Sequence, residues 1–315
     1  MARQIVTVFG GSGFLGRYVV QQLAASGAIV RACVRDAESA LFLKPFGDPG
    51  QIVPMAVRIT DVDDVERAVE GASSVVNLVG ILAPWGKNTF QSAHVNGPRL
   101  IAEVCAAKGV ERLVHISAIG ADLQADSIYA RTKAEGEQAV LEAFPAATIV
   151  RPSVVFGPED KFFNLFGGLA CIAPVLPLIG GGKTMFQPVY VNDVARAVAA
   201  ILDIPATCGK TYELGGPKTY SFRSLMEYLL TEIRRERALI SVPFALASFK
   251  AWFLEKIPEP LLTRDQVKLL RHDNVVSSGA LSFAELGLEP TPLEAIVPGY
   301  VHRYRPPSRQ GPRSQ

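Results

Sequence analysis

Short apolar runs alternate with amphipathic stretches through the first half of the chain. The apolar runs predict strands at 5–9, 29–34, 52–57, 75–79, 112–117 and 147–151. Apolar residues at helical spacing predict helices at 14–23, 62–69, 91–108 and 128–143. This alternation is typical of an α/β fold with a doubly wound parallel sheet, in which right-handed crossovers bring the carboxyl ends of the strands to one rim.

The pattern changes after Arg151-Pro152, where Pro and Gly cluster and the strands become harder to identify. Helical patterns return at 193–202 and 222–235. We expect a Rossmann domain at 1–152, to which later segments return, and a smaller C-terminal α/β lobe at 153–305 that lies over the ligand rim and contacts a substrate or partner. A polar tail at 306–315 is predicted to be disordered.

Composition and charge exclude several classes of protein. The chain has 315 residues, of which 49% are hydrophobic, and a net charge of +2, which is too small to indicate nucleic-acid binding. The four cysteines are widely spaced, which favours reduced thiols, and the histidines lack metal-ligand spacing, so we expect no metal site. No apolar run reaches the roughly 18 residues that span a bilayer, and the first strand begins almost at once. We therefore expect neither a transmembrane helix nor a signal peptide.

A glycine-rich turn follows the first predicted strand and precedes the first predicted helix. It fits two registers, Gly11-x-Gly13-x-x-Gly16, which is the general dinucleotide fingerprint, and Gly10-x-x-Gly13-x-x-Gly16. Glycines allow a phosphate to approach the backbone, and a helix N-terminus offers free N–H groups. We expect pyrophosphate contacts from Gly10, Ser12, Gly13, Phe14, Leu15 and Gly16; the alternative is a turn without a ligand.

The end of the second strand points to NADP(H). Arg35 lies nineteen residues past Gly16, where a site selective for NAD usually has a carboxylate. A guanidinium can pair with the 2′-phosphate of NADP, and Arg17 or Arg31 could add charge. Asp36 follows immediately, so a shift of one residue would reverse the preference.

The ends of the third and fourth strands supply further candidates. Asp61-Val62 follows the third strand, where the short acid can accept a hydrogen bond from the adenine amino group. Asp61 can also cap the helix that follows. After the fourth strand, Leu78 and its neighbours would run beside the ribose through backbone atoms, unless they only end the strand.

Ser117, Tyr129 and Lys133 are the candidate catalytic residues. The spacing of Tyr129 and Lys133 places both on one helix face, so the ammonium can lower the phenol pKa from about 10 and bind ribose hydroxyls. Ser117, at the end of the fifth strand, could orient a carbonyl or hydroxyl. Such a set suits proton transfer coupled to hydride transfer, with Tyr129 as acid or base.

Together these motifs resemble the extended and atypical short-chain dehydrogenase/reductase superfamily, including its NAD-dependent epimerase/dehydratase-like members. The resemblance rests on the spacing Gly10-x-x-Gly13-x-x-Gly16, on Ser117, Tyr129 and Lys133, and on Arg151-Pro152 and residues 187–193. Within the superfamily, residues 151–166, 187–191 and 262–267 resemble the NADPH-binding accessory subunits of respiratory complex I, NADH:ubiquinone oxidoreductase.

This resemblance implies a tightly held NADP(H) and a place on the hydrophilic arm of complex I, near the membrane and the quinone chamber. For a bacterial protein it implies a peripheral position on the cytoplasmic face of the inner membrane. These accessory subunits are not known for turnover. The alternatives are a free-standing NADP-dependent reductase, epimerase or dehydratase that uses Ser117, Tyr129 and Lys133, and a nucleotide-sensing regulator.

Two segments of the second half suggest contact with a membrane or a partner. Residues 239–257 are rich in Phe, Leu and Trp, interrupted by Lys250 and Lys256, which suits a helix against a membrane interface or a hydrophobic partner. The alternative is a buried helix that begins at Pro243. The basic end of the chain could meet anionic lipid or an acidic subunit, or serve only solubility; it contains His302, Arg303, Arg305, Arg309 and Arg313.

Overall fold

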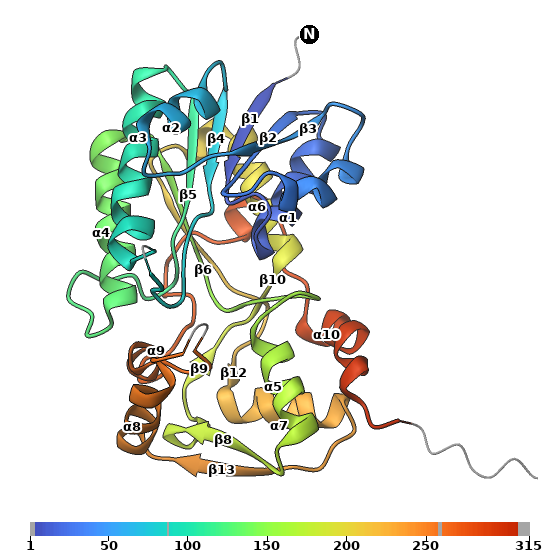
Figure 1. Cartoon of the computed structure of the whole chain (residues 1–315). Helices are drawn as coiled ribbons and strands as arrows, with labels where there is room; N and C mark the ends of the chain where they lie inside the picture. Colours follow the sequence, from blue (N-terminus) through green and yellow to red (C-terminus); the bar gives the residue numbers. More distant parts are fainter. Residues whose placement is uncertain (1–3, 87, 258–259, 308–315) are drawn as a thin grey trace, which may run out of the picture.

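A parallel sheet of seven strands forms the middle layer of the upper lobe in Figure 1. The computed structural model describes residues 4–86, 88–257 and 260–307. The strand order is β11-β6-β5-β4-β1-β2-β3, and every pairing is parallel. The strands span β1 Ile5–Phe9, β2 Ile29–Val34, β3 Ile52–Ala56, β4 Ser74–Asn77, β5 Arg112–Ile116, β6 Thr148–Pro152 and β11 Thr211–Leu214. The predicted doubly wound fold is confirmed, and its order reverses between β1 and β4, where such folds bind ligands.

Helices cover both faces of the sheet, as the strand burial requires. Successive residues of β4 to β6 face opposite sides: Val76, Val114 and Val150 belong to one core cluster, and Val75, Leu113 and Ile149 to the other. The first cluster packs against α1 (Phe14–Ala25) and α6 (Val191–Asp203). The second packs against α2 (Val62–Val69), α3 (Gly97–Ala107) and α4 (Ile128–Ala143). The side chains on both faces of these strands are apolar because both faces are buried.

The C-terminal lobe has small sheets and its own core. Three two-stranded sheets pair β7 (Val155–Phe156) with β10 (Val189–Tyr190), β8 (Val175–Ile179) with β13 (Ala238–Val242), and β9 (Met185–Phe186) with β12 (Tyr220–Ser221). The helices are α5 (Phe162–Ile172), α7 (Phe222–Glu232), α8 (Phe244–Leu254), α9 (Arg264–Leu269) and α10 (Leu293–Val301). Residues of α6 and β11 return from this half of the chain to the central sheet.

Two predicted helices need correction. The predicted helix at 91–108 begins as a turn of π-helix, Gln91–Asn96, before α3. The segment 239–257 is not one helix, because its first residues form β13, which pairs in parallel with β8. Pro243 then caps α8, so the predicted helix start at this proline is confirmed. Helical spacing alone missed the strand because its pairing partner lies more than sixty residues earlier in the sequence.

The thiols and the basic end of the chain are also placed. All four cysteines are free, and Cys33 and Cys105 are core residues, as predicted. Arg303 donates to the carbonyl oxygens of Tyr300 and Pro158, and Arg305 pairs with Glu232, so these two arginines are bound to their own chain. Arg309, Arg313 and residues 308–315 of the predicted disordered tail lie outside the described residues.

None of the helices within the described ranges combines the length and the apolarity that crossing a membrane would need.

Candidate functional site

The glycine loop between β1 and α1 has the geometry of a phosphate cradle. Gly10 has a φ of +82°, its N–H donates to the carbonyl oxygen of Cys33 (2.9 Å), and the Gly13 N–H donates to that of Gly10 (3.0 Å). Gly13 caps α1 without any side-chain hydrogen bond, and the first turn of α1 carries no acidic residue. The first N–H groups of the helix therefore remain available to an anion.

Close packing in this loop leaves no room for a side chain at Gly16. A Cβ atom there would lie 2.2 Å from the carbonyl oxygen of Gly10 and 2.7 Å from that of Gly11. This close approach draws the N-terminus of α1 against the end of β1, which is the role of the third glycine in a dinucleotide fingerprint. The predicted pyrophosphate residues, Gly10, Ser12, Gly13, Phe14, Leu15 and Gly16, thus form one continuous loop and helix start that fits a dinucleotide.

Of the three arginines predicted to add positive charge, only Arg35 is free among the described residues. It is exposed directly after β2. Arg31 donates to the carbonyl oxygens of Ala68 (3.0 Å) and Glu70 (2.5 Å), which hold its guanidinium at the end of α2, so a contribution of its charge to a phosphate site stays a prediction. Arg17 pairs with Glu159 (3.5 Å) and lies over the ring of Phe42.

Asp36 is engaged in its own turn. Its carboxylate accepts from the N–H of Glu38 (3.1 Å), and its carbonyl oxygen accepts from the Ser39 hydroxyl (2.7 Å). These bonds begin the 3₁₀ segment Glu38–Phe46. Asp36, the residue that would favour NAD, therefore stabilises a turn through its side chain, while the neighbouring Arg35 makes no such bond within the described residues.

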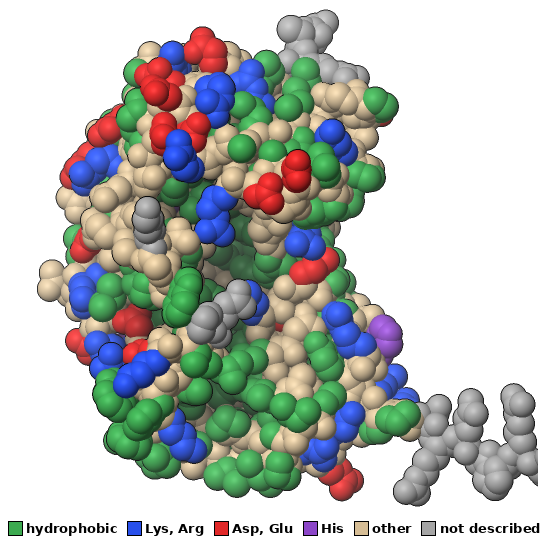
Figure 2. All heavy atoms as spheres, viewed as in Figure 1, with side chains coloured by type: hydrophobic (Ala, Val, Ile, Leu, Met, Phe, Trp, Pro, Cys, Tyr) green, Lys and Arg blue, Asp and Glu red, His purple; other side chains and the backbone are tan. Residues whose placement is uncertain are grey.

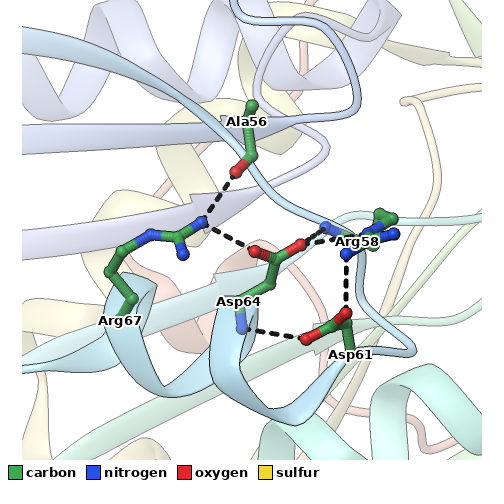
Figure 3. A network of polar contacts seen from close by, with 5 residues as sticks. All are labelled: Ala56, Arg58, Asp61, Asp64 and Arg67. Atoms are coloured by element: carbon green, nitrogen blue, oxygen red, sulfur yellow. Dashed lines mark hydrogen bonds and ion pairs between the residues drawn. The ribbon is translucent and has the colours of Figure 1, made fainter.

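Asp61 is the N-cap of α2, so that interpretation is confirmed. Its side chain accepts from the N–H of Asp64 (3.3 Å) and pairs with Arg58 (2.7 Å), within a network that also holds Arg67 (Figure 3). The backbone N–H of Arg58, followed by the side chain of Arg67, lowers the pKa of Asp64. Val62 is half exposed as the first residue of α2. A contact of Asp61 and Val62 with adenine stays a prediction.

The chain after β4 runs between the glycine loop and α4. The Leu78 N–H donates to the carbonyl oxygen of Phe9 (2.9 Å), and a Cβ atom at Gly10 would lie 3.4 Å from the Leu78 carbonyl carbon. A Cβ atom at Gly80 would lie 3.5 Å from the Lys133 ammonium. This is the position predicted for the ribose, beside the backbone of Leu78.

Lys133 reaches from α4 to the end of β5, next to Ser117. Its ammonium donates to the carbonyl oxygen of Ile116 (2.9 Å), and burial lowers its pKa to about 8. Ser117 is buried, its N–H donates to the carbonyl oxygen of Val150 (2.7 Å), and its hydroxyl has no partner in the described part of the chain. The unpaired hydroxyl is a free polar group beside the lysine, which suits the role predicted for it.

Tyr129 lies one helical turn before Lys133, but its pKa moves opposite to the prediction. Its ring packs edge-on against His94, with ring centroids 5.3 Å apart, and against Phe90. Burial raises the pKa of Tyr129 to about 12, whereas we predicted that Lys133 would lower it. The reason is that the lysine ammonium bonds the Ile116 carbonyl, so desolvation dominates at the phenol.

Two buried histidines complete the surroundings of Lys133. The Nε2 atom of His94 accepts from the Ile81 N–H (3.1 Å), and its Nδ1 atom bonds the Thr132 hydroxyl (3.0 Å). Burial, and then the charge of Lys133, lower the pKa of His94 to about 3. Sequence reasoning missed His94 because only the π-helical turn, which no local pattern predicts, brings it against Tyr129.

His115 is a core residue, as its place in a strand predicted. Asn77 accepts from the Val79 N–H through Oδ1 (3.1 Å), so its Nδ2 donates to Nδ1 of His115 (3.1 Å). The ring proton of His115 is therefore on Nε2. Within the described ranges, no three His, Cys, Asp or Glu side chains come together in a way that could hold a metal ion.

Comparisons with known proteins agree with this geometry. The model of the NAD dependent epimerase/dehydratase family matches residues 6–215. The NADH dehydrogenase (ubiquinone) 1 alpha subcomplex subunit 9 of Arabidopsis thaliana, a mitochondrial protein, is 39% identical over 313 residues, which cover 96% of this chain and 78% of the relative. The mitochondrial NADH-ubiquinone oxidoreductase 40 kDa subunit of Neurospora crassa is 34% identical over 300 residues, covering 95% and 79%.

A solved structure shares the fold. The dTDP-glucose 4,6-dehydratase of Streptomyces venezuelae, determined with NAD bound, superposes with a TM-score of 0.71 at 20% identity and covers 96% of each chain. At this identity the likeness concerns the fold alone.

Proposed function

The chain belongs to the NAD dependent epimerase/dehydratase family, as its motifs predicted, and we propose that it is an NADP(H)-binding accessory subunit of respiratory complex I. The observation that carries this proposal is the identity of 34–39% to complex I subunits over 95–96% of the chain. The similarity extends through the C-terminal lobe. It therefore includes the second half of the chain, which contains fewer motifs of the wider superfamily.

The choice of NADP(H) over NAD(H) rests on Arg35. Its guanidinium is exposed and free at the end of β2, among the described residues, while the neighbouring Asp36 is engaged in its own turn. A guanidinium forms charge-assisted hydrogen bonds to a phosphate, which a carboxylate would repel. The loop from Gly10 to Gly16 would hold the pyrophosphate, and Lys133 the ribose.

In this role the nucleotide is mainly structural or regulatory. A ligand that binds only the folded chain stabilises it by roughly 4 kcal/mol at a thousandfold excess over its dissociation constant. The glycine loop, the segment after β4 and α4 all contribute to the site, so a bound nucleotide would hold together elements from distant parts of the sequence. Such a cross-link can order an interface without any reaction.

The surface of α8 is our candidate for contact with complex I or the membrane beside it. Phe249 is 61% exposed, Phe253 51% and Trp252 43%, and Lys256 lies over the Trp252 ring at 4.1 Å. Figure 2 shows apolar side chains gathered on this part of the C-terminal lobe. Aromatic residues with a flanking lysine suit the boundary between apolar and aqueous phases. We propose that this surface faces the region of the quinone chamber, and in a bacterium the cytoplasmic side of the membrane.

A second candidate function is catalysis by the same site. It is favoured by the presence of Ser117, Tyr129 and Lys133 together and by the unpaired Ser117 hydroxyl. A bound nicotinamide would supply or accept a hydride. Tyr129 would give or take the proton, Ser117 would orient the reacting oxygen, and Lys133 would bind ribose.

Extraction of the tagged chain in mild detergent, from cells that naturally make it, tests both functions. We expect the wild-type chain to co-migrate with complex I subunits and to release NADP(H) on denaturation, identified by mass spectrometry. The variant Tyr129→Phe should keep both properties under the accessory-subunit proposal. A chain that carries no nucleotide and never co-migrates with complex I would refute that proposal. If the wild-type chain shows an NADP(H)-dependent turnover and Tyr129→Phe abolishes it, the catalytic function is favoured.

A further inference from the structure

The N-terminus of α4, the helix that carries Tyr129 and Lys133, is capped by a residue from the other lobe. Asp265 accepts from the N–H of Ile128 through Oδ1 (2.7 Å) and from that of Tyr129 through Oδ2 (3.0 Å). The same Oδ2 accepts from the hydroxyl of Ser127 (2.7 Å), which in turn caps the helix at Ala130. Two of the N–H groups that a helix start leaves unpaired are thus satisfied by a carboxylate more than 130 residues later in the chain.

Asp265 is itself held firmly by α9. It lies in the first turn of this helix, whose start is fixed by a reciprocal capping box between Thr263 and Gln266. The Lys268 ammonium donates to the carbonyl oxygen of Asp126 (3.1 Å), so α9 meets the segment before α4 at a second point. Val267 is fully buried in an apolar cluster.

That cluster joins α9 to α8. It contains Val267 of α9 and the two buried residues of α8, Ala247 and Ala251. Glu255, at the end of α8, accepts from the backbone N–H (2.5 Å) and the side chain (2.9 Å) of Arg264. The aromatic surface of α8 and the backbone of Tyr129 are therefore connected through one short helix and one carboxylate.

We infer that Asp265 is a positioning residue for the nucleotide site, by which the C-terminal lobe fixes the start of α4 and so the place of Tyr129 and Lys133. The inference deepens the proposed function and rests on its nucleotide site. A carboxylate at a helix N-terminus forms charge-assisted hydrogen bonds and interacts favourably with the helix dipole. Because coupling between two sites is reciprocal, whatever α8 binds changes nucleotide affinity by the factor with which the nucleotide changes that binding.

The test uses the full chain with Asp265→Ala, Asp265→Asn and, as matched control, Glu255→Gln. Glu255 anchors the same end of α9 to α8, but within the described residues it bonds Arg264 and not α4. We measure the dissociation constant of NADPH by fluorescence titration. Hydrogen exchange, with and without NADPH, reports the amides of Ile128, Tyr129 and residues 263–267.

We expect Asp265→Ala to weaken NADPH binding about tenfold, as for loss of hydrogen bonds to a charged group, and to speed exchange at Ile128 and Tyr129. Asp265→Asn keeps one acceptor oxygen, so its NADPH affinity should lie between those of Asp265→Ala and the wild type. This variant also keeps the test valid if Asp265→Ala folds poorly. NADPH should slow hydrogen exchange at residues 263–267 in the wild type, and this protection should be lost in Asp265→Ala. The control should stay within about twofold of wild type in affinity.

Three results would overturn the inference. The first is wild-type NADPH affinity in both Asp265 variants, which refutes the positioning role alone. The second is unchanged exchange at Ile128 and Tyr129, and the third is an equal loss of affinity in Glu255→Gln, which would indicate general destabilisation of α9. A wild-type chain that binds no NADPH refutes the proposed nucleotide site itself, so the two failures are distinguishable.

Discussion

Replacing Gly16 with alanine should weaken nucleotide binding about 100-fold by distorting the glycine loop. The added Cβ atom would lie 2.2 Å from the carbonyl oxygen of Gly10, whereas ordinary contacts begin at 3.4 Å. The obstacle is backbone, which cannot turn aside as a flexible side chain can, so the loop or α1 must move by more than about 1 Å. Overpacking of this kind costs about 1–3 kcal/mol of stability. A misplacement of 1 Å in a preorganised site can cost about 100-fold, which we expect here in NADPH affinity.

Thermal unfolding with and without NADPH measures both effects. At a hundredfold excess over its dissociation constant, NADPH should stabilise the wild type by about 2.7 kcal/mol and leave Gly16→Ala almost unshifted. Gly168→Ala is the matched control, because Gly168 lies within α5 and a Cβ atom there meets nothing within 4 Å. That variant should be more stable by about 0.5–1 kcal/mol and bind NADPH normally. Wild-type stability and wild-type NADPH affinity in Gly16→Ala would refute the reasoning.

Three further predictions concern single side chains. Arg35→Ala should weaken NADPH binding by about 10- to 100-fold and leave NADH binding unchanged, since only NADPH carries the 2′-phosphate; equal losses in isothermal titrations of both nucleotides would contradict this. Lys133 has a folded pKa of about 8 against an ordinary 10.5, so between these pH values the unfolded chain holds the extra proton and stability rises with pH, by up to about 3 kcal/mol. In urea unfolding, the stability of Lys133→Met relative to wild type should therefore fall across this window, and a constant difference would be evidence against a buried, destabilised ammonium. Asp61→Ala should cost about 1 kcal/mol through loss of the N-cap, while Asp61→Asn retains the cap and should cost less; equal losses in urea unfolding would assign the effect to the ion pair with Arg58 instead.

Local signals in the sequence determined the glycine loop and six strands of the central sheet, while the seventh strand, β11, was not predicted. Strands buried on both faces are continuous apolar runs, and amphipathic helices repeat at 3.6 residues, so β1 to β6 and α1 to α4 follow from periodicity. The loop from Gly10 to Gly16 is equally local, because its glycines meet one another's backbone. The spacing of Tyr129 and Lys133 fixes their shared helix face without any knowledge of the fold.

The partners of charged groups were decided only by the tertiary structure. Arg31 and Arg35 look alike in the sequence, yet one is bound to the end of α2 and the other is free among the described residues. Burial raises the pKa of Tyr129, while the Lys133 ammonium bonds a strand carbonyl. Asp265 caps α4 across more than 130 residues. Hydrogen bonds and desolvation depend on which distant atoms come within about 3 Å, whereas periodicity records only which side of an element is apolar.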